Sequence, residues 1–303
     1  MRKIIKALKN PRLAIIYLLN QKIFRLIPDK LYIKIKYRLC IGKKLDLNKP
    51  QGLNEKMQWL KLYDRNPLYT NLVDKYKVRE YIKNTIGEEY LIPLLGVYDG
   101  YDEIDFNSLP KEFVLKPNHT SGDIYICHDK DQIDHRKLEK DIKRWLKRKY
   151  YWIHREWPYK NVKPRIVCEK YMVDHESGDM KDYKIECFNG KATGTYVCLL
   201  RESTEGLAID YYDRNWNFIP GGVDFRNSGI LLQRPKNFNK MIEIAEELSK
   251  DIPYVRIDLY EINGQVYFGE LTFFPGAGFV PFKPDSFDYL LGSWLELPSK
   301  KLK

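Results

Sequence analysis

The chain has 303 residues, and its 44% hydrophobic content with 23 Tyr, 13 Phe and 6 Trp is enough for a sizeable core, which excludes a disordered protein. Five cysteines without a C-x-x-C pair and five scattered histidines argue against a disulfide framework and a zinc site, and favour a reducing, cytoplasmic compartment. The net charge of +11 is uneven, because residues 1–50 contain 14 Lys or Arg and only two acids. Basic charge confined to one end, without a recognised module, argues against nucleic acid as a partner.

Residues 1–52 are predicted to form a basic helical extension, because apolar residues recur at helical spacing with Lys and Arg between them. The longest uncharged run, 13–21, is much shorter than the ~20 residues that cross a bilayer. No small-residue cleavage site follows it, which argues against a signal peptide. Two interpretations remain open. Residues 1–50 either make a peripheral contact with the inner face of the plasma membrane, or form a helical hairpin packed on the body with a solvated basic face.

The periodicity of the remaining chain predicts an α+β protein. Helical patterns cover residues 54–87, 134–151 and 236–251, and the helix at 134–151 is very basic. Strand patterns cover residues 90–98, 112–127, 164–173 and 181–200, the last with a turn at Asn189-Gly190. This order favours mostly antiparallel strands over a doubly wound parallel sheet.

The strands at 112–127 enclose a loop of small polar residues. Lys116 stands at the end of the first strand, and residues 118–122 can present backbone N–H groups to a phosphate, with the lysine as a point charge. The spacing of a P-loop is absent and no helix follows. The alternative is a lysine that is merely solvated at a strand end.

Two further strands carry polar residues. Glu169, Lys170 and Tyr171 end an apolar strand and suit a hinge that reads an adenine edge. Asp182, Lys184 and Glu186 share one strand face that is too polar for a core, which indicates a phosphate-facing or substrate-facing row. An edge strand that faces water explains both patterns nearly as well.

The run 256–276 (RIDLYEINGQVYFGELTFFPG) predicts a strand hairpin that carries Asp258 and Glu270. Buried unpaired carboxylates are expensive, so we expect a divalent cation between them, with phosphate oxygens on its other side. The alternative is an ordinary amphipathic hairpin whose acids face water.

The length of the turn in this hairpin decides which face of the sheet each side chain occupies. A two-residue turn at Asn263-Gly264 would place Glu270 on the face opposite Asp258. We therefore expect an odd-length connection with a bulge at Gly264. Such a connection would bring Arg256, Asp258, Glu270 and Thr272 to one face.

Five segments occur together in an order that resembles the ATP-grasp superfamily, in particular the TupA-like proteins of teichuronopeptide biosynthesis. They are DKYKVREY at 74–81, LKPNHTSGD at 115–123, VCEKY at 167–171, DYKIECFNGK at 182–191, and the hairpin with its extension FGELTFFPGAGF at 268–279. The resemblance spans about residues 53–297. It implies two α+β subdomains that clasp ATP between mostly antiparallel sheets. The expected parts are a basic helical extension (1–52), a helical N-terminal part (53–108), a lid subdomain with the phosphate loop (109–172) and a core subdomain with the metal site (173–303).

The resemblance also implies roles for individual residues. The nucleotide-binding positions are Lys116, Asn118, His119, Thr120, Ser121, Gly122, Glu169, Lys170, Tyr171 and Lys184. Arg256 and Lys184 are implied to be the catalytic contacts, with Arg256 on a phosphate or intermediate. Asp258 and Glu270 are implied to bind Mg²⁺, while Thr272 stands where relatives usually have Asn, so its coordination of the metal is expected to be weaker. The lid loop has only one glycine, where many relatives have more.

The activity that the resemblance implies is that of an ATP-dependent carboxylate–amine ligase with an acyl phosphate intermediate. Its partners would be an acidic glycan or uronic-acid precursor and an amine, in the biosynthesis or modification of cell-surface polysaccharide. Arg201 is a candidate for holding the acid, because arginine pairs bidentately with carboxylates. The alternatives are an ATP-grasp phosphotransferase, and a glycosyltransferase or non-catalytic polysaccharide assembly protein.

Overall fold

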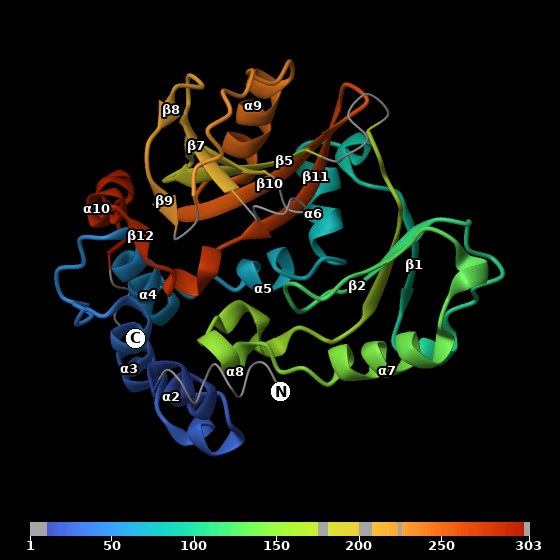
Figure 1. The fold of residues 1–303 in the computed structure, drawn as a ribbon, viewed down its shortest axis with the longest axis horizontal. Coiled ribbons are helices and arrows are strands. Elements are labelled where there is room, and N and C mark those ends of the chain that lie inside the picture. The colour runs from blue at the N-terminus through green and yellow to red at the C-terminus, as the bar shows by residue number, and fades with distance from the viewer. Residues whose placement is uncertain (1–10, 175–180, 200–207, 224–225, 300–303) are drawn as a thin grey trace.

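The computed structural model describes residues 11–174, 181–199, 208–223 and 226–299. Helices and two main antiparallel sheets make up this part of the chain, which confirms the expected α+β class. In Figure 1 the larger sheet lies at the top, the smaller sheet at the right, and the N-terminal helices at the lower left.

The smaller sheet has the strand order β1-β4-β2-β3. Its strands are β1 (Leu94–Tyr98), β2 (Phe113–Pro117), β3 (Tyr125–Cys127) and β4 (Ile166–Lys170). Helix α7 (His135–Leu146) packs against it with Leu138, Ile142 and Trp145, while its basic residues stay exposed, as the sequence pattern predicts. The side chain of Asp134 caps α7 by accepting a hydrogen bond from the backbone N–H of Lys137.

The larger sheet has the order β11-β10-β5-β6-β7-β8. Its strands are β5 (Lys181–Phe188), β6 (Lys191–Leu199), β7 (Ala208–Asp213), β8 (Phe218–Ile219), β10 (Tyr254–Ile262) and β11 (Gln265–Thr272). One face packs on α9 (Phe238–Leu248) through apolar residues such as Val255 and Ile257, both fully buried. Because side chains alternate along a strand, Arg256 and Asp258 face the other side. That second face carries the polar site.

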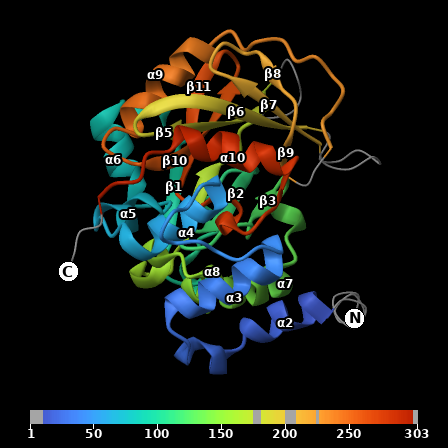
Figure 2. The same cartoon turned by 90° about the vertical axis from the view of Figure 1, so that its left-hand side faces the viewer.

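Five more α-helices belong to the described part of the body. They are α4 (Leu53–Tyr63), α5 (Leu68–Leu72), α6 (Val78–Thr85), α8 (Tyr151–His154) and α10 (Asp285–Trp294). Helices α4 and α10 lie side by side (Figure 2). Their approach is close, because a Cβ at Gly292 would lie 2.1 Å from the carbonyl oxygen of Gln51. The short helix η6 (Pro275–Gly278) packs on α4, and strands β9 (Gly222–Val223) and β12 (Phe282–Lys283) form a small ribbon nearby.

The β10–β11 hairpin corrects one expectation. Its turn has two residues, since Ile262 pairs with Gln265 across Asn263-Gly264, so the odd-length connection and the bulge at Gly264 are wrong. The register instead shifts between Asp258, which pairs with Glu270, and Leu259, which pairs with Phe268. Gly269 is therefore the extra residue of a β-bulge, which restores the parity that brings the two carboxylates to one face.

The N-terminal extension consists of α2 (Pro11–Leu19), the 3₁₀ helix η1 (Lys22–Leu26) and α3 (Asp29–Ile41). Helix α3 packs on the body through Tyr32, Ile33 and Tyr37, none of which is more than 1% exposed. Helix α2 and η1 instead leave several large apolar side chains exposed. Within the described residues, no helix combines the length and the apolar character needed to traverse a bilayer.

Candidate active site

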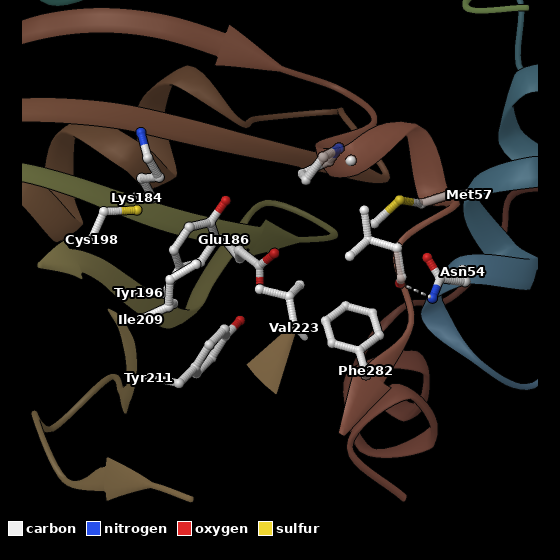
Figure 3. Close-up of a pocket in the computed structure, with 13 residues that line it drawn as sticks. Asn54, Met57, Lys184, Glu186, Tyr196, Cys198, Ile209, Tyr211, Val223 and Phe282 are labelled. Atoms are coloured by element: carbon white, nitrogen blue, oxygen red, sulfur yellow. Dashed lines mark hydrogen bonds between the residues drawn. The ribbon is translucent and has the colours of Figure 1, made fainter. Parts of the chain in front are cut away.

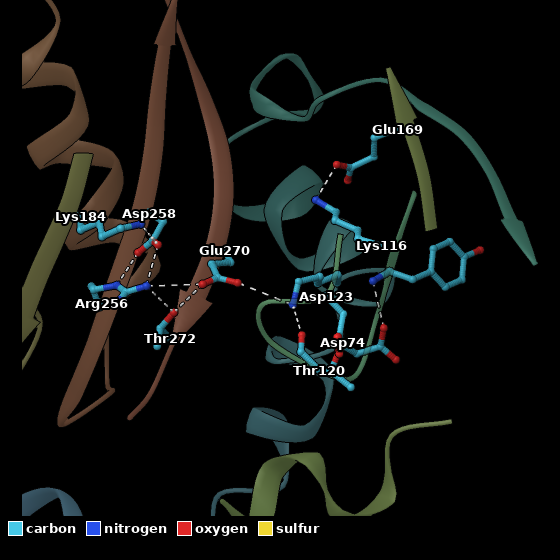
Figure 4. Close-up of polar contacts among 12 residues, drawn as sticks. Asp74, Lys116, Thr120, Asp123, Glu169, Lys184, Arg256, Asp258, Glu270 and Thr272 are labelled. Carbon is cyan, nitrogen blue, oxygen red and sulfur yellow. Dashed lines mark hydrogen bonds and ion pairs between the residues drawn. The ribbon is translucent and has the colours of Figure 1, made fainter. Parts of the chain in front are cut away.

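A buried network of charges covers the polar face of β10 and its neighbours β5 and β11 (Figure 4). The guanidinium of Arg256 donates to both oxygens of Asp258, with Nε to Oδ1 at 2.6 Å and Nη2 to Oδ2 at 2.7 Å. Lys184 on β5, which pairs with Asp258 in the ladder, donates to Oδ2 at 2.6 Å. Asp258 is only 2% exposed, so these two cations supply the compensation that its burial requires.

Glu270 on β11 extends the network toward the smaller sheet. Its Oε1 accepts a hydrogen bond from the Thr272 hydroxyl at 3.1 Å and lies 3.4 Å from Nη2 of Arg256. Its Oε2 lies 3.6 Å from Nζ of Lys75. Burial alone would raise the pKa of Glu270, but Lys75, Arg256 and Lys184 outweigh it and lower the pKa to about 2. Glu270 is therefore an ionised acceptor at neutral pH.

A second cluster lies on the smaller sheet. Nζ of Lys116, at the end of β2, is 2.6 Å from Oε2 of Glu169 on β4, and Nη1 of Arg79 is 3.5 Å from Oε1 of the same carboxylate. The side chains of Lys116 and Glu169 are 17% and 8% exposed, so Lys116 is not the freely solvated lysine of the alternative interpretation. Figure 4 shows this pair on the side of Glu270 away from Arg256 and Asp258.

The segment Asp74-Lys75 joins the two clusters through the loop that follows β2. Nζ of Lys75 donates to the carbonyl oxygen of Thr120 at 2.7 Å, and the backbone N–H of Lys75 donates to the carbonyl oxygen of Asn118. Oδ1 of Asp74 accepts a hydrogen bond from Nδ2 of Asn118 at 2.9 Å. The start of the loop is thus held against the body, while Lys75 lies between the loop and Glu270.

The predicted phosphate loop divides into two halves. Asn118, His119 and Thr120 are buried, and the ring of His119 contacts Asn118 and the carbonyl oxygen of Arg148. Burial lowers the pKa of His119. Ser121 and Gly122 are exposed, and Gly122 has a φ of +81°, a backbone conformation that favours glycine. Only the second half of the loop therefore offers accessible backbone to a ligand.

Of the three residues of the predicted adenine hinge, only Glu169 contacts the charged clusters described above. Glu169 points to Lys116, as described above. Lys170 is exposed, and its backbone N–H already donates to the carbonyl oxygen of Pro93 at 3.0 Å. Tyr171 packs edge-on against the ring of His128. Contact of Lys170 and Tyr171 with adenine remains a prediction, as does ligation by Thr272.

Asp258 and Glu270 remain the predicted ligands of a magnesium ion that is shared with a substrate. Within the described part of the chain, no group of three or more His, Cys, Asp or Glu side chains could hold a metal by itself. Mg²⁺, however, is commonly bound by one or two carboxylates together with substrate phosphates. Asp258 and Glu270 are directly paired across the ladder, share one face and offer hard oxygen donors. The guanidinium of Arg256 lies between them as an internal counter-cation.

Beside Lys184 the same sheet face opens into a cavity of about 210 Å³ (Figure 3). It is lined by residues of β5, β6, β7, β9, α4 and the segment after β11, namely Asn54, Met57, Lys184, Glu186, Tyr196, Cys198, Ile209, Tyr211, Val223, Pro275, Gly276, Val280 and Phe282. The charged network and the cavity are therefore neighbours on one sheet.

Sequence reasoning missed two contributors to the network. Lys75 lies in the segment 74–81 that carried part of the resemblance, but nothing in that pattern indicates a side chain that reaches Glu270. Tyr196, whose hydroxyl accepts a hydrogen bond from Nη1 of Arg256 at 2.5 Å, reads as an ordinary strand residue. Arg201, the candidate for holding an acid, lies outside the described residues.

A model of the TupA-like ATPgrasp family matches residues 55–296. No curated protein matches the chain by sequence. Among solved structures, D-alanyl-alanine synthetase A from Vibrio cholerae is similar with a TM-score of 0.42 and 11% identity, over 79% of this chain and 62% of that one. D-alanine–D-alanine ligase from Bacillus anthracis has a TM-score of 0.40 and 16% identity, over 72% and 58%. The ATP-grasp ligase PsnB in complex with its minimal precursor has a TM-score of 0.39 and 10% identity, over 72% and 58%.

The chain spans less than two thirds of the length of these three structures, and a likeness this distant carries no argument about activity. The family match, in contrast, covers most of the chain and contains the five segments that carried the resemblance. It confirms that resemblance: the chain belongs to the TupA-like ATP-grasp family.

Proposed function

We propose that this protein is an ATP-dependent ligase that joins a carboxylate to an amine through an acyl phosphate. The observation that carries the proposal is the row of cations and carboxylates formed by Lys75, Lys184, Arg256, Asp258 and Glu270, which faces a phosphate-loop segment. Such a row meets the main demand of phosphoryl transfer, which is to position the phosphates and stabilise their charge.

Each residue has a role in this proposal. Lys75 and Lys116 supply positive charge on the side of the smaller sheet, and Arg256 and Lys184 supply it on the side of the larger sheet. Asp258 and Glu270 would hold Mg²⁺, which neutralises phosphate charge when it is bound. Arg256 and Lys184 are already held by Asp258, so their geometry is organised before a substrate arrives.

The chemistry then runs in two steps. The substrate carboxylate takes the γ-phosphoryl group of ATP and becomes an acyl phosphate. An amine attacks the acyl carbon and displaces phosphate. Because an acyl phosphate hydrolyses in water, the site must exclude solvent during the reaction. The contact between Lys75 and Thr120 supports such a role for the loop, since it links the loop to the body beside Glu270.

For the acid we propose a uronic acid of a cell-surface glycan precursor, processed at the inner face of the plasma membrane. The exposed apolar side chains of the N-terminal extension support the location: Ile23 is 72% exposed, Leu26 88% and Leu31 51%. The exposed Lys22 and Lys30 are close to them in the chain. Apolar side chains beside lysines are the features by which helices bind an anionic membrane surface.

The test combines wild-type protein with ATP, magnesium, glucuronic acid or a uronic-acid oligosaccharide, and hydroxylamine, which traps acyl phosphates as hydroxamates. The proposal predicts ADP release that depends on the acid, together with hydroxamate, and loss of both in Glu270→Gln. The matched control is Glu243→Gln, an exposed residue on α9. ADP release with a stable phosphate ester would instead indicate a phosphotransferase, and nucleotide binding without turnover a non-catalytic protein.

A further inference from the structure

The cavity beside Lys184 adjoins the charged network of the proposed ligase. Lys184 both lines the cavity and donates to Asp258, so one side chain connects the cavity with the charged network. Strands β5, β6 and β7 form one wall, and the segment 275–282 after β11 forms part of the other. A molecule in this cavity would have its inner end beside the acyl phosphate, if that intermediate forms at the network.

The size and the lining of the cavity favour a ligand that is small and largely apolar. A cavity of about 150 Å³ can hold a benzene molecule, so the cavity of about 210 Å³ suits an amino-acid side chain or a short amine better than a sugar chain. Most of the lining is apolar or aromatic, with Met57, Ile209, Val280 and Phe282 among its members. Such walls favour apolar contacts over a hydrated sugar.

Two polar groups in the lining lack partners within the described residues. Glu186 is 3% exposed, and its Oε1 accepts a hydrogen bond from the Tyr254 hydroxyl at 2.8 Å, while its Oε2 has no hydrogen-bond partner. The Tyr211 hydroxyl, which points toward the middle of the cavity in Figure 3, also has none. Buried polar groups normally have hydrogen-bond partners, so a carboxylate oxygen that lacks one in a cavity indicates a ligand with an N–H group.

We infer that this cavity, which we name the acceptor pocket, binds an amine carried on an apolar or aromatic body, and that Glu186 receives the proton of its nitrogen. The inference rests on the proposed ligase function. The neutral amine attacks the acyl carbon, the C–N bond forms as the C–O bond to phosphate breaks, and phosphate leaves with that electron pair. Glu186 takes the proton that the nitrogen loses. Burial raises the pKa of Glu186 to about 7, which suits a group that accepts a proton near neutral pH.

The position of Glu186 also separates it from the acid substrate. It is on the same strand face as Lys184, but its ladder partner is Arg256 rather than Asp258. A substrate carboxylate is repelled by the Glu186 carboxylate and attracted to the cations of the charged network. The two substrates are therefore expected to meet from opposite sides of Lys184, the acid at the network and the amine in the acceptor pocket.

The experiment compares hydroxylamine, a minimal nucleophile that needs no pocket, with amines that carry a larger apolar, aromatic or sugar group. Wild-type protein receives ATP, magnesium and glucuronic acid with hydroxylamine, 3-methylbutylamine, 2-phenylethylamine or glucosamine, and products are identified by mass. We expect amides of the two apolar amines in preference to glucosamine. Glu186→Gln should lower the ratio of amide to hydroxamate by about 100-fold or more, the range of general base catalysis. Glu243→Gln should leave the ratio unchanged.

A second variant tests the pocket without touching the proton acceptor. Cys198→Phe places a ring in the cavity and should raise the KM for 2-phenylethylamine by at least about tenfold, equivalent to ~1.4 kcal/mol, without raising the KM for hydroxylamine. Hydroxamate formation with an unchanged ratio in Glu186→Gln would overturn the inference while leaving the ligase function intact. A raised KM for glucuronic acid in Cys198→Phe, with an unchanged KM for the amine, would assign the cavity to the acid and overturn it as well. Absence of hydroxamate with every carboxylate would remove the ligase function and this inference together.

Discussion

Glu186 gives a prediction of stability that needs no substrate. Burial raises its pKa from 4.5 to about 7, with the hydrogen bond from Tyr254 opposing the rise. Between these two pH values the native protein binds more protons than the unfolded chain, so the free energy of unfolding falls as the pH rises through this window. The difference corresponds to ~3 kcal/mol at about 1.36 kcal/mol per pH unit. Because Glu186 is 3% exposed, solvent screening reduces this figure little.

The perturbation is Glu186→Gln, which keeps the shape and removes the titration. Urea unfolding of both proteins at about pH 5 and about pH 8 should show similar stability at the lower pH and a variant that is more stable by ~3 kcal/mol at the higher pH. Titration of other groups cancels in the difference. The charged and titratable groups that face Glu186 or share its pocket are Lys184, Tyr196, Tyr211, Tyr254, Arg256 and Asp258, and all of them are present in both proteins. A difference that does not change with pH would refute the reasoning.

Three further variants test other parts of the structure. Lys75→Met should raise the KM for ATP by about 10- to 100-fold, as expected from ~1.5–3 kcal/mol for a charge-assisted contact, and should raise the pKa of Glu270, measurable by NMR titration. Gly269→Ala should destabilise the protein by ~1–3 kcal/mol in thermal unfolding, because its Cβ would lie 2.9 Å from a tyrosine ring, whereas Gly100→Ala meets nothing and should not. Leu26→Glu should abolish sedimentation with anionic vesicles without changing hydroxamate formation; wild-type protein that stays in the supernatant would contradict the membrane contact.

Hydrophobic periodicity and turn residues predicted the helices and strands well where the pattern extended over many residues. The strand pairs around Asn189-Gly190 and Asn263-Gly264, and the helix at 236–251, all occur near the expected residues. The family resemblance followed from motifs that occur in the expected order, and the match over 55–296 confirms it. These features depend on residues that are close in the chain, which is why sequence alone could reveal them.

The bulge could not be located in this way. The alternation of side chains along the strands correctly required one extra residue between Asp258 and Glu270, but two glycines were available, Gly264 and Gly269. Which one bulges depends on contacts across the ladder: the carbonyl oxygen of Asp258 lies so close that a Cβ at Gly269 would be 3.0 Å from it. The role of Lys75 is also set by tertiary structure, because the segment between α5 and α6 reaches Glu270 only when the two sheets are assembled.

The N-terminal extension shows the same limit. The same amphipathic pattern is compatible with both interpretations, membrane contact and packing on the body. In the structure α3 is packed through Tyr32, Ile33 and Tyr37, while Ile23 and Leu26 on η1 stay exposed. Neighbouring helical segments of similar composition thus differ in how much of their apolar surface is buried. The difference depends on which other segments of the chain pack against each of them.

The most direct test of the account is the magnesium dependence of ATP binding, measured by isothermal titration calorimetry in wild-type protein, Glu270→Gln and the control Glu243→Gln. We predict that wild-type protein and the control bind ATP at least ~10-fold more tightly with magnesium than with EDTA, a difference of ~1.4 kcal/mol. Glu270→Gln, folded as judged by its melting curve, should lose that difference. An equal magnesium dependence in Glu270→Gln and wild-type protein would contradict the claim that the β10–β11 carboxylates form the metal–nucleotide site.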